Sequence, residues 1–495
     1  MQALRILAKT WWVALMVLFC RAAAAQGYVV KLHDASSANA IIHEYGIELV
    51  DWTDPAPFYL FSIPPRRAGE ILDALREDWR VDWVESELPV DSPGANTRSR
   101  GGTIPVVGSR SNLYDQNTHM LEQIGWDEGV ALGGPTRTRV AILDTGIPFE
   151  ARHLWEKSVA WLNTVDPGSP PIDEGNGFDD NDNDLIDEGL GHGSMVAGLI
   201  DQISPNSELV ICRIADDEGE STSWHLIKGL VFSTLNEAQV ISVSLGTPFE
   251  FRAVSSVVQW VLDRGVVVVA PIGNDSAPIA LYPSANEGAL CVSGVDDQDH
   301  RADFSNWSER ADVSAPATGM ASLWWDGTIG FWEGTSFATP LVAGTIAVGL
   351  SYCADLERDS LDDLLAETGD CIDELNPGYE GQLGNRLNFQ RFVMRVRDED
   401  DSDVVSLTIS VNPFAIRGGT EGVGVITLSR PLDEALWVYT WVDGPGTTLG
   451  WVMVPAGSTR AEFPILTEWV GDSLGASIYV QAGEILSTGE FMVIP

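Results

Sequence analysis

Basic residues are scarce in this chain. Lys and Arg together number 29 against 72 Asp and Glu among 495 residues, which gives a formal net charge of -43. Binding to nucleic-acid phosphates requires clustered Lys and Arg, and the sequence lacks such clusters. The imbalance therefore excludes a nucleic-acid partner and predicts a strongly solvated, acidic surface.

Cysteine is also rare, with 5 in the chain. Cys20 falls in the first, apolar stretch, and Cys212 and Cys291 lie inside apolar runs where we expect buried thiols. Cys353 and Cys371 remain. Export from the cell would permit a disulfide between these two, although their spacing alone does not establish one.

Long apolar runs are lacking except at the start of the chain. Two basic residues precede an apolar run from Trp11 to Cys20, and the small residues Ala22 to Ala25 follow it. This order predicts a signal peptide over residues 1–25. A retained anchor would need roughly 20 apolar residues. We therefore expect a secreted, extracellular protein with no membrane span after signal removal.

What is present divides into segments. Residues 26–90 alternate strand-like runs (YVVKL, FYLFSI, RVDWVE) with a helical stretch, AGEILDALRED, which predicts a small α+β module. Residues 91–112 are rich in Gly, Ser, Pro and Arg and predict an exposed linker open to cleavage.

Residues 113–395 alternate short, branched apolar runs with helical patterns. The runs are TRVAIL, ELVICRI, VISVSL, VVVVA and ALCVSGV. This alternation predicts an α/β domain with a mostly parallel sheet and helices on both faces. In such sheets functional sites lie at the carboxyl ends of the strands.

The last part of the chain changes character again. Residues 396–403 are acidic and predict a linker. Residues 404–495 alternate strand-like runs such as VSLTISV, GVGVITLS and SIYVQA with turn residues, a pattern typical of a β-sandwich.

Three short runs pair one reactive side chain with small residues: VAILDTGI, GHGSMVAGLI and GTSFATPLVAG. Asp144 ends an apolar strand and therefore emerges at the carboxyl edge of the sheet. His192 lies between two glycines at a predicted helix start. Ser336 follows a glycine and precedes a helical run, so its backbone N–H can face a developing negative charge.

These residue types together indicate nucleophilic catalysis. A serine hydroxyl is a poor nucleophile at neutral pH until a base takes its proton, and a carboxylate must hold that base in the right tautomer. The chain offers Ser336, His192 and Asp144 for the three roles. A metal-dependent hydrolase is disfavoured, because the sequence has no paired-histidine ligand motif.

The motifs around Asp144, His192 and Ser336, in that order along the chain, resemble those of the subtilases. The resemblance extends from about Leu113 to about Asn388. It implies a subtilisin-like fold and a serine endopeptidase that cleaves polypeptide substrates through an acyl-enzyme, with no cofactor required for the chemistry.

The same resemblance implies further site residues. VVVVAPIGND places Asn274 where the family has its oxyanion side chain, beside Gly273 as a substrate-binding residue. ISVSLG resembles the strand that pairs with extended substrate, so Ser244, Leu245 and Gly246 are expected to line the primary specificity pocket.

The flanking segments also resemble known parts. Residues 26–90, with RVDWVESE near their end, resemble the propeptide of subtilases, which implies a folding aid and inhibitor in a self-processing zymogen. VPAGSTRAEFPI and its surroundings resemble an immunoglobulin-like domain, whose role the fold does not decide.

Two departures from the family pattern stand near the site. Ser194 and Met195 follow the catalytic His and Gly where the family usually has Thr and His, and Pro271 interrupts the small-residue run before Asn274. Ser194 keeps the hydroxyl. We expect altered packing near the site and a functional enzyme.

The run DEGNGFDDNDNDLIDEG has two interpretations. Alternate carboxylates at Asp180, Asp182 and Asp184 can surround a hard cation, which would make a structural Ca²⁺ site. However, Leu185 stands where the helix-loop-helix calcium pattern needs Gly. The alternative is a solvated loop of an acidic protein.

A rival function from another class is a binding or adhesion protein on a retired peptidase scaffold, with the carboxyl-terminal sandwich as its working part. Loss of a triad residue would indicate such a protein. All three residues are present, which favours the peptidase.

Overall fold

The computed structural model describes residues 27–91, 110–399 and 407–495, apart from residues 135, 355, 357, 430, 433, 434, 449, 483 and 484. The expected signal peptide (1–25), most of the expected linker 91–112 and residues 400–406 lie outside this part. The chain divides into two compact units, one that ends at Leu88 and one that begins at Pro89.

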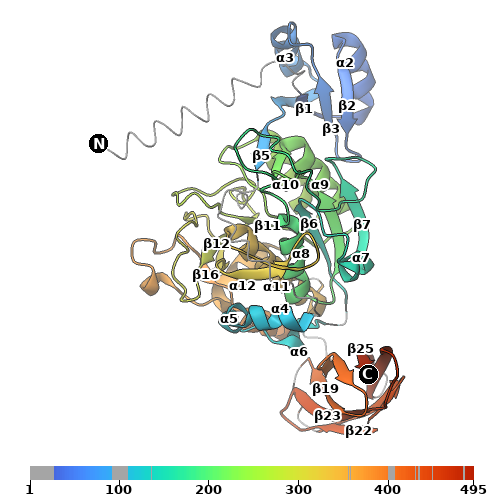
Figure 1. Ribbon diagram of the computed structural model, residues 1–495. Helices are drawn as coiled ribbons and strands as arrows, with labels where there is room; N and C mark the ends of the chain where they lie inside the picture. The colour runs from blue at the N-terminus through green and yellow to red at the C-terminus, as the bar shows by residue number, and fades with distance from the viewer. Residues whose placement is uncertain are drawn as a thin grey trace. The chain divides into compact units, whose positions relative to one another are not determined.

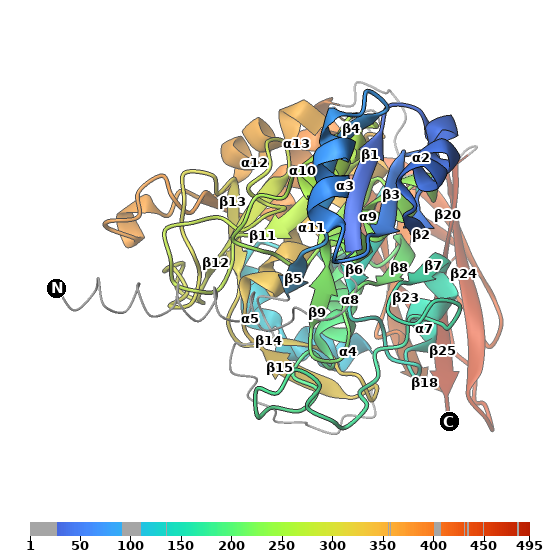
Figure 2. The ribbon, with the colours of Figure 1, turned by 90° about the horizontal axis from the view of Figure 1, so that it is seen from above.

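The first unit is a small α+β module, as expected. Its antiparallel sheet has the strand order β2-β3-β1-β4. Its two helices lie against this sheet (Figure 2). Ile41, Ile71 and Leu75 of the helices pack with Val30 and Phe61 of the sheet in a separate core. The elements are β1 (Gly27–Leu32), α2 (Ala38–Tyr45), β2 (Glu48–Trp52), β3 (Phe58–Ser62), α3 (Ala68–Glu77) and β4 (Val81–Ser86).

An eight-stranded sheet forms the centre of the second unit, with the order β16-β13-β12-β11-β10-β6-β8-β7 and every neighbouring pair parallel (Figure 1). The α/β prediction is confirmed. The strands are β6 (Arg139–Asp144), β7 (Ser158–Asn163), β8 (Glu208–Arg213), β10 (Val240–Val243), β11 (Val267–Pro271), β12 (Leu290–Val295), β13 (Val313–Pro316) and β16 (Asn385–Arg386).

Helices cover both faces of this sheet. Ile142 packs in the core with α8 (His192–Ile203) and α11 (Thr335–Tyr352), which contact each other. The next residue, Leu143, faces Gly229 of α9 (Ser223–Leu235), which contacts α10 (Arg252–Leu262). Successive strand residues point to opposite faces, so the strands are apolar throughout because both faces are buried.

Helix α10 shows how the sequence pattern produces a local element. Val254, Val257, Val258 and Val261 are all buried along one stripe. Gly265 ends the turn after the helix with φ of 75°, a left-handed conformation that glycine adopts without a steric cost.

Shorter elements surround the sheet. They are β5 (Pro89–Asp91), α4 (Arg110–Gln116), α5 (Thr118–Gln123), α6 (Glu128–Ala131), α7 (Arg152–Lys157), β9 (Glu220–Thr222), β14 (Met320–Leu323), β15 (Ile329–Trp332), α12 (Leu361–Thr368) and α13 (Phe389–Glu399). α4 begins inside the stretch expected to be a linker, and α13 extends into the expected acidic linker 396–403. Phe389, Phe392, Val393 and Val396 bury one stripe of α13, which explains its continuation.

Residues from Leu407 onward form a β-sandwich with its own core, as predicted. One sheet has the order β17-β19-β23-β21 and the other β18-β25-β24-β20-β22. The strands are β17 (Leu407–Asn412), β18 (Ala415–Arg417), β19 (Glu421–Leu428), β20 (Leu436–Asp443), β21 (Gly446–Thr447), β22 (Trp451–Val454), β23 (Arg460–Thr467), β24 (Leu474–Ala482) and β25 (Ile485–Ile494).

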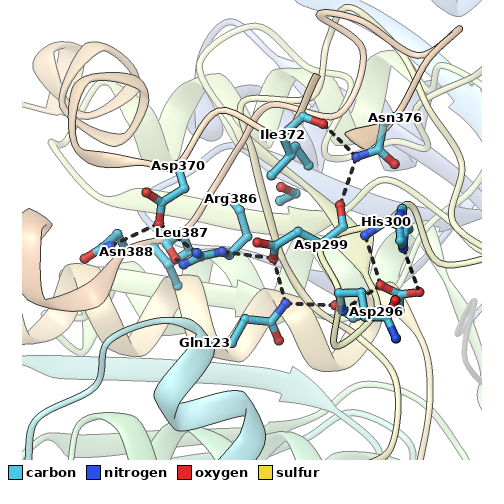
Figure 3. Close-up of polar contacts among 12 residues, drawn as sticks. Gln123, Asp296, Asp299, His300, Asp370, Ile372, Asn376, Arg386, Leu387 and Asn388 are labelled. Atoms are coloured by element: carbon cyan, nitrogen blue, oxygen red, sulfur yellow. Dashed lines mark hydrogen bonds and ion pairs between the residues drawn. The ribbon is translucent and has the colours of Figure 1, made fainter. Parts of the chain in front are cut away.

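A polar network anchors the short edge strand β16 (Figure 3). Arg386 is buried, and its guanidinium contacts Asp299 at 3.1 Å and Asp370 at 2.7 Å. Gln123 of α5 also donates to Asp299, at 2.7 Å, and Asn388 donates to Asp370 at 3.1 Å. Segments distant in sequence are thereby held at the end of the sheet.

The cysteines follow the buried-thiol expectation where they lie in strands. Cys212 and Cys291 are buried free thiols, and burial raises the pKa of each to about 12. Cys353 and Cys371 are not bonded to each other in this structure, and Cys371 is exposed.

Candidate active site

Asp144 and His192 meet at the carboxyl end of the central sheet. Asp144 is the last residue of β6 and His192 is the first residue of α8. His192 Nδ1 lies 2.7 Å from Asp144 Oδ1, and the two residues are 0% and 1% exposed. An ionised carboxylate only accepts, so Nδ1–H is the donor and the other ring nitrogen, Nε2, is the one able to take a proton.

The glycines on either side of His192 are required by the backbone. Gly191 has φ of 91°, in the left-handed region. A Cβ on Gly193 would lie 2.4 Å from the carbonyl oxygen of Gly146. The helix start can therefore approach the end of β6 only because both residues lack side chains.

A second buried carboxylate, Asp173, supports this arrangement and was not identified from the sequence. It accepts hydrogen bonds from Ser194 N at 3.1 Å, from the Ser194 hydroxyl, from Gly191 N at 3.2 Å and from Thr145 Oγ1 at 3.1 Å. Thr145 Oγ1 in turn accepts from Gly193 N at 2.9 Å. Burial raises the pKa of Asp173, and the hydrogen bonds act against that rise. The sequence did offer one indication of this carboxylate. The hydroxyls of Thr145 and Ser194, which belong to the two motifs, each need a hydrogen-bond acceptor when buried.

Ser336 lies in the first turn of α11, and the residue after it, Phe337, packs against the His192 ring. The ring of Phe337, the next residue, is 5.1 Å from the imidazole between centroids, and Trp332 meets it edge-on at 5.7 Å. Ser336 is fully buried, and its Oγ makes no hydrogen bond within the described residues. Its N–H is one of the donors that a helix start leaves without an intrahelical partner.

Asn274 is held in a fixed orientation close to Ser336. Its Oδ1 accepts from Thr335 N at 2.9 Å and from Thr335 Oγ1 at 2.8 Å. Its Nδ2 lies 3.2 Å from the position that a Cβ on Gly334 would take. Asn274 Nδ2 therefore lies close to the start of α11.

The comparisons with known proteins agree with this geometry. A family model described as the subtilase family matches residues 136–390, half of the chain.

The chain belongs to the subtilase family.

Among its relatives is an alkaline protease of Alkalihalobacillus alcalophilus, 30% identical over 328 residues that span 64% of this chain and 76% of the relative. A thermophilic serine proteinase of Bacillus sp. (strain AK1) is 28% identical over 243 residues, 47% of this chain and 56% of its own. The structure of a cold adapted subtilisin-like serine proteinase covers 50% of this chain and 88% of its own, with 27% identity and a TM-score of 0.44. This subtilase is a serine endopeptidase.

The residues expected to bind substrate lie in two segments at the same end of the subtilase sheet. Ser244, Leu245 and Gly246 follow β10, and all three are buried or nearly so. Ser244 Oγ donates to the Ser336 carbonyl oxygen at 3.0 Å. Gly273, with φ of 116°, follows β11. The structure thus brings both segments to the Ser336 end of the sheet.

The two departures from the family pattern are accommodated by packing. Met195 belongs to α8, and its side chain is fully buried in the central core. Its carbonyl oxygen accepts from Ser322 Oγ at 2.7 Å. Pro271 ends β11, and its carbonyl oxygen accepts from Ser284 Oγ at 3.0 Å. The Ser194 hydroxyl donates to Asp173. Ser at this position therefore keeps a hydroxyl group that hydrogen-bonds to the buried carboxylate.

The acidic loop does not gather the three carboxylates that were proposed as metal ligands. The side chains of Asp180, Asp182 and Asp184 are exposed, and the backbone is left-handed at Asp182 (φ 59°) and Asp184 (φ 68°). The expected cation site required side chains two residues apart to point the same way, and these turns interrupt that regular backbone. Across residues 27–91, 110–399 and 407–495, with the gaps noted above, no group of three or more His, Cys, Asp or Glu is arranged to hold a metal ion.

Proposed function

We propose that Asp144, His192 and Ser336 form the catalytic triad of this subtilase, and that the enzyme hydrolyses peptide bonds through an acyl-enzyme. The observation that supports this most directly is the buried 2.7 Å contact between His192 Nδ1 and Asp144 Oδ1, next to the start of α11 that carries Ser336. Exclusion of water from both residues strengthens the interaction.

In the proposed mechanism Ser336 Oγ attacks the substrate carbonyl carbon while His192 Nε2 takes the hydroxyl proton. The imidazolium then returns this proton to the leaving amine, and a water molecule repeats the sequence on the ester. Asp144 holds the tautomer and stabilises the imidazolium. The Ser336 backbone N–H and Asn274 Nδ2 donate to the oxyanion.

We also propose that the chain is made as a zymogen whose amino-terminal module inhibits the enzyme. In support, Pro89–Asp91 (β5) pair in antiparallel register with β9, and the Val90 side chain is fully buried. An extended substrate gains affinity by pairing with an exposed strand edge in this way. The segment after Leu88 therefore occupies an edge that a substrate would use.

Export is a further part of the proposal. Its support is the pattern of residues 1–25, which lie outside the described part of the chain. Within the described residues, no helix combines the length and the apolar character needed to cross a membrane.

The test compares the full chain with Ser336→Ala and with Ser458→Ala, a matched substitution on a turn of the sandwich. Intact mass and labelling by a serine-directed phosphonate are measured at neutral pH with calcium present. We expect the parent and Ser458→Ala to lose their first residues up to the 91–112 stretch and to take the label. Ser336→Ala should do neither.

If the parent chain stays full length and unlabelled, the assignment of the nucleophile fails. The binding or adhesion function on the same scaffold would then replace it, and Met195 and Pro271 would be the first residues to restore to the family pattern.

A further inference from the structure

The outer face of one sandwich sheet carries aromatic side chains that point toward solvent. In β20, Val438 and Thr440 point inward and are buried. Trp437, Tyr439 and Trp441 alternate with them, and Trp437 is 58% and Tyr439 42% exposed. Because successive side chains of a strand point to opposite faces of a sheet, these three rings lie in one row on the solvent side.

The neighbouring strands widen this row. Trp451 of β22 lies opposite Tyr439, and Tyr479 of β24 lies opposite Trp441. The ring centroids are 5.1 Å apart in the first pair and 5.0 Å apart in the second. Tyr439 and Trp441 are 5.9 Å apart and connect the two pairs. We call Trp437, Tyr439, Trp441, Trp451 and Tyr479 the aromatic face.

The stability of the sheet explains this array only in part. Aromatic pairs across neighbouring strands contribute some stability. However, Trp451 is 59% exposed, as Trp437 nearly is, and the core on the other side of these strands is formed by residues such as Val438 and Val452. A polar residue in place of either tryptophan would leave that core intact. A contiguous exposed aromatic surface therefore indicates a binding site that a partner covers.

Acidic side chains adjoin the aromatic face. Asp443 is exposed and is the next outward residue of β20 after Trp441. It lies opposite Ser477, which in turn lies opposite Glu490 of β25 and donates to its carboxylate at 2.8 Å. The sequences of β20, β22, β24 and β25 contain no Lys or Arg. Rings and carboxylates on one face are the complement of a cationic ligand.

The orientation of the rings separates a cationic ligand from a flat one. Trp451 and Tyr439 are inclined by 58°, and Tyr439 and Trp441 by 30°. Trp441 and Tyr479 stack at 8°. The five rings therefore share no common plane, and a sugar chain would meet no continuous flat platform. Ring faces turned in several directions suit compact cations, which bind over the negative face of a π system.

The charge of the whole chain narrows the choice of partner. A formal net charge of -43 repels a second copy of this chain, and it repels an anionic membrane surface in the same way. The same charge attracts a basic polypeptide. Charge and ring geometry thus favour the same occupant.

The spacing along β20 indicates an extended chain with several cations. Outward residues recur at every second position, so Tyr439, Trp441 and Asp443 follow one another at intervals of about 7 Å. Alternate residues of an extended peptide have the same interval. A single small cation would reach one of these groups, whereas a peptide with basic residues at alternate positions reaches several.

We propose that the aromatic face binds an extended basic polypeptide that contains Arg. Guanidinium groups would lie over the rings of Tyr439 and Trp451, and a further Arg would pair with Asp443. Arg suits both contacts better than Lys, because its planar group stacks on aromatic rings and binds a carboxylate through two hydrogen bonds. This binding surface goes beyond the proposed function and does not depend on peptide-bond hydrolysis.

The experiment uses the full chain with Ser336→Ala as the parent, so that the probe stays intact. Fluorescence anisotropy measures the binding of a labelled peptide of alternating Gly and Arg at about 0.15 M NaCl, where long-range attraction is largely screened. The comparison probes are a peptide of alternating Gly and Lys of the same length and a neutral hexamer of N-acetylglucosamine. We expect the Arg peptide to bind at least about threefold more tightly than the Lys peptide.

Two tryptophan variants test the rings. Trp451→Leu keeps an apolar side chain and removes the ring. Trp469→Leu is the matched control, because Trp469 is 74% exposed and is not part of the aromatic face. We expect Trp451→Leu to weaken binding of the Arg peptide about tenfold and Trp469→Leu to leave it within about twofold of the parent. Trp451→Tyr, which restores a ring, should bind within about threefold of the parent.

Two acidic variants test the carboxylate and need no change in the rings. Asp443→Asn removes one charge beside the aromatic face, and Asp472→Asn removes one from an exposed position in the turn before β24. The two variants have the same net charge. Asp443→Asn should weaken binding about threefold or more, whereas Asp472→Asn should not. This pair decides the matter if thermal unfolding shows that Trp451→Leu is not folded.

Several results would overturn the binding surface. If folded Trp451→Leu and Trp469→Leu bind the Arg peptide equally, attraction comes from the charge of the whole chain. Equal binding of the Arg and Lys peptides has the same meaning. If Trp451→Leu loses thermal stability and keeps its affinity, the rings only stabilise the sheet. If the sugar hexamer binds the parent and not Trp451→Leu, the aromatic face belongs to a polysaccharide.

Discussion

At the scale of single residues, the candidate site depends on small backbone features as much as on its reactive side chains. Gly193 permits a carbonyl contact that any Cβ would block, and Asp173 links Thr145 to Ser194. These contacts orient the first turn of α8 and hence the imidazole of His192. A preorganised site of this kind requires little rearrangement when charge develops during the reaction.

Asn274→Ala is expected to lower kcat by about 10²–10³-fold with a much smaller change in KM, because the amide would donate to charge that develops only in the transition state. The measurement is steady-state kinetics on enzyme freed of its amino-terminal segment. Thr335→Val serves as the control, since it removes only the hydroxyl that contacts Asn274 Oδ1. If the kcat of Asn274→Ala stays within about threefold of that of the parent, the oxyanion role of Asn274 is wrong.

At the scale of elements, the edge strand β16 is only two residues long, and side chains hold it in register. Arg386 bridges Asp299 and Asp370 (Figure 3). Arg391 also contacts Asp370. A short edge strand offers few ladder hydrogen bonds, so the charged network supplies the missing contacts.

Asp370 connects this network to acid stability. Burial alone would raise its pKa, but hydrogen bonds from Asn388 and Arg391 and the charge of Arg386 outweigh burial and hold the pKa below its ordinary value of 3.8. A carboxyl whose pKa is depressed on folding contributes stability above its unfolded pKa, and that contribution is lost as pH falls through the folded value.

We therefore expect Asp370→Asn to be about 1–2 kcal/mol less stable than the Ser336→Ala parent at pH 7, and the difference to shrink below about pH 4. Urea unfolding at a series of pH values measures this. Glu374→Gln, an exposed acidic residue of the same loop, should show no such difference at any pH. A gap between Asp370→Asn and the parent that stays constant down to pH 3 would contradict the assignment.

At the scale of the whole molecule, the three largest hydrophobic cores of the described residues lie in the amino-terminal module, around the central sheet and in the sandwich. The whole chain of 495 residues carries a formal net charge of -43. Like charges repel across a compact surface, and added salt screens that repulsion.

Raising NaCl from about 0.05 M to about 0.5 M is expected to increase the midpoint of thermal unfolding by a few degrees at constant calcium. Scanning calorimetry of the Ser336→Ala chain at pH 7.5 measures it. A midpoint that falls or stays level across this range would show that surface repulsion has no measurable effect on the stability of this protein.

Much of the fold was predictable because its signals are local. The apolar runs that became β6, β8, β10, β11 and β12 are near-continuous, as strands buried on both faces must be, and the stripe of Val residues in α10 follows the helical period. The segment expected to be an acidic linker was harder to predict. α13 continues into it because apolar residues earlier in the helix reach the core, while its last residues are acidic.

The candidate site also has parts that local sequence signals predict and parts that depend on contacts between distant segments. Asp144, His192 and Ser336 stand in short motifs whose small residues are visible in the sequence. The sequence by itself determined the order of these three residues along the chain and predicted them as the reactive groups. Only the tertiary structure decided which groups surround them. Asp173 and Leu281 lie outside the motifs whose residues they contact, and nothing in their own neighbours marks them.

The physical reason is that burial and pairing are properties of contacts between distant segments. From the sequence, alternation along a regular backbone brings Asp180, Asp182 and Asp184 together. The folded loop instead turns left-handed at Asp182 and Asp184, which a local pattern does not reveal. The turn between β8 and β9 packs against that loop, where Asp180 N donates to Glu218 Oε1 at 3.1 Å. Likewise, only the folded chain brings the side chain of Leu281 against both Gly246 and Gly273.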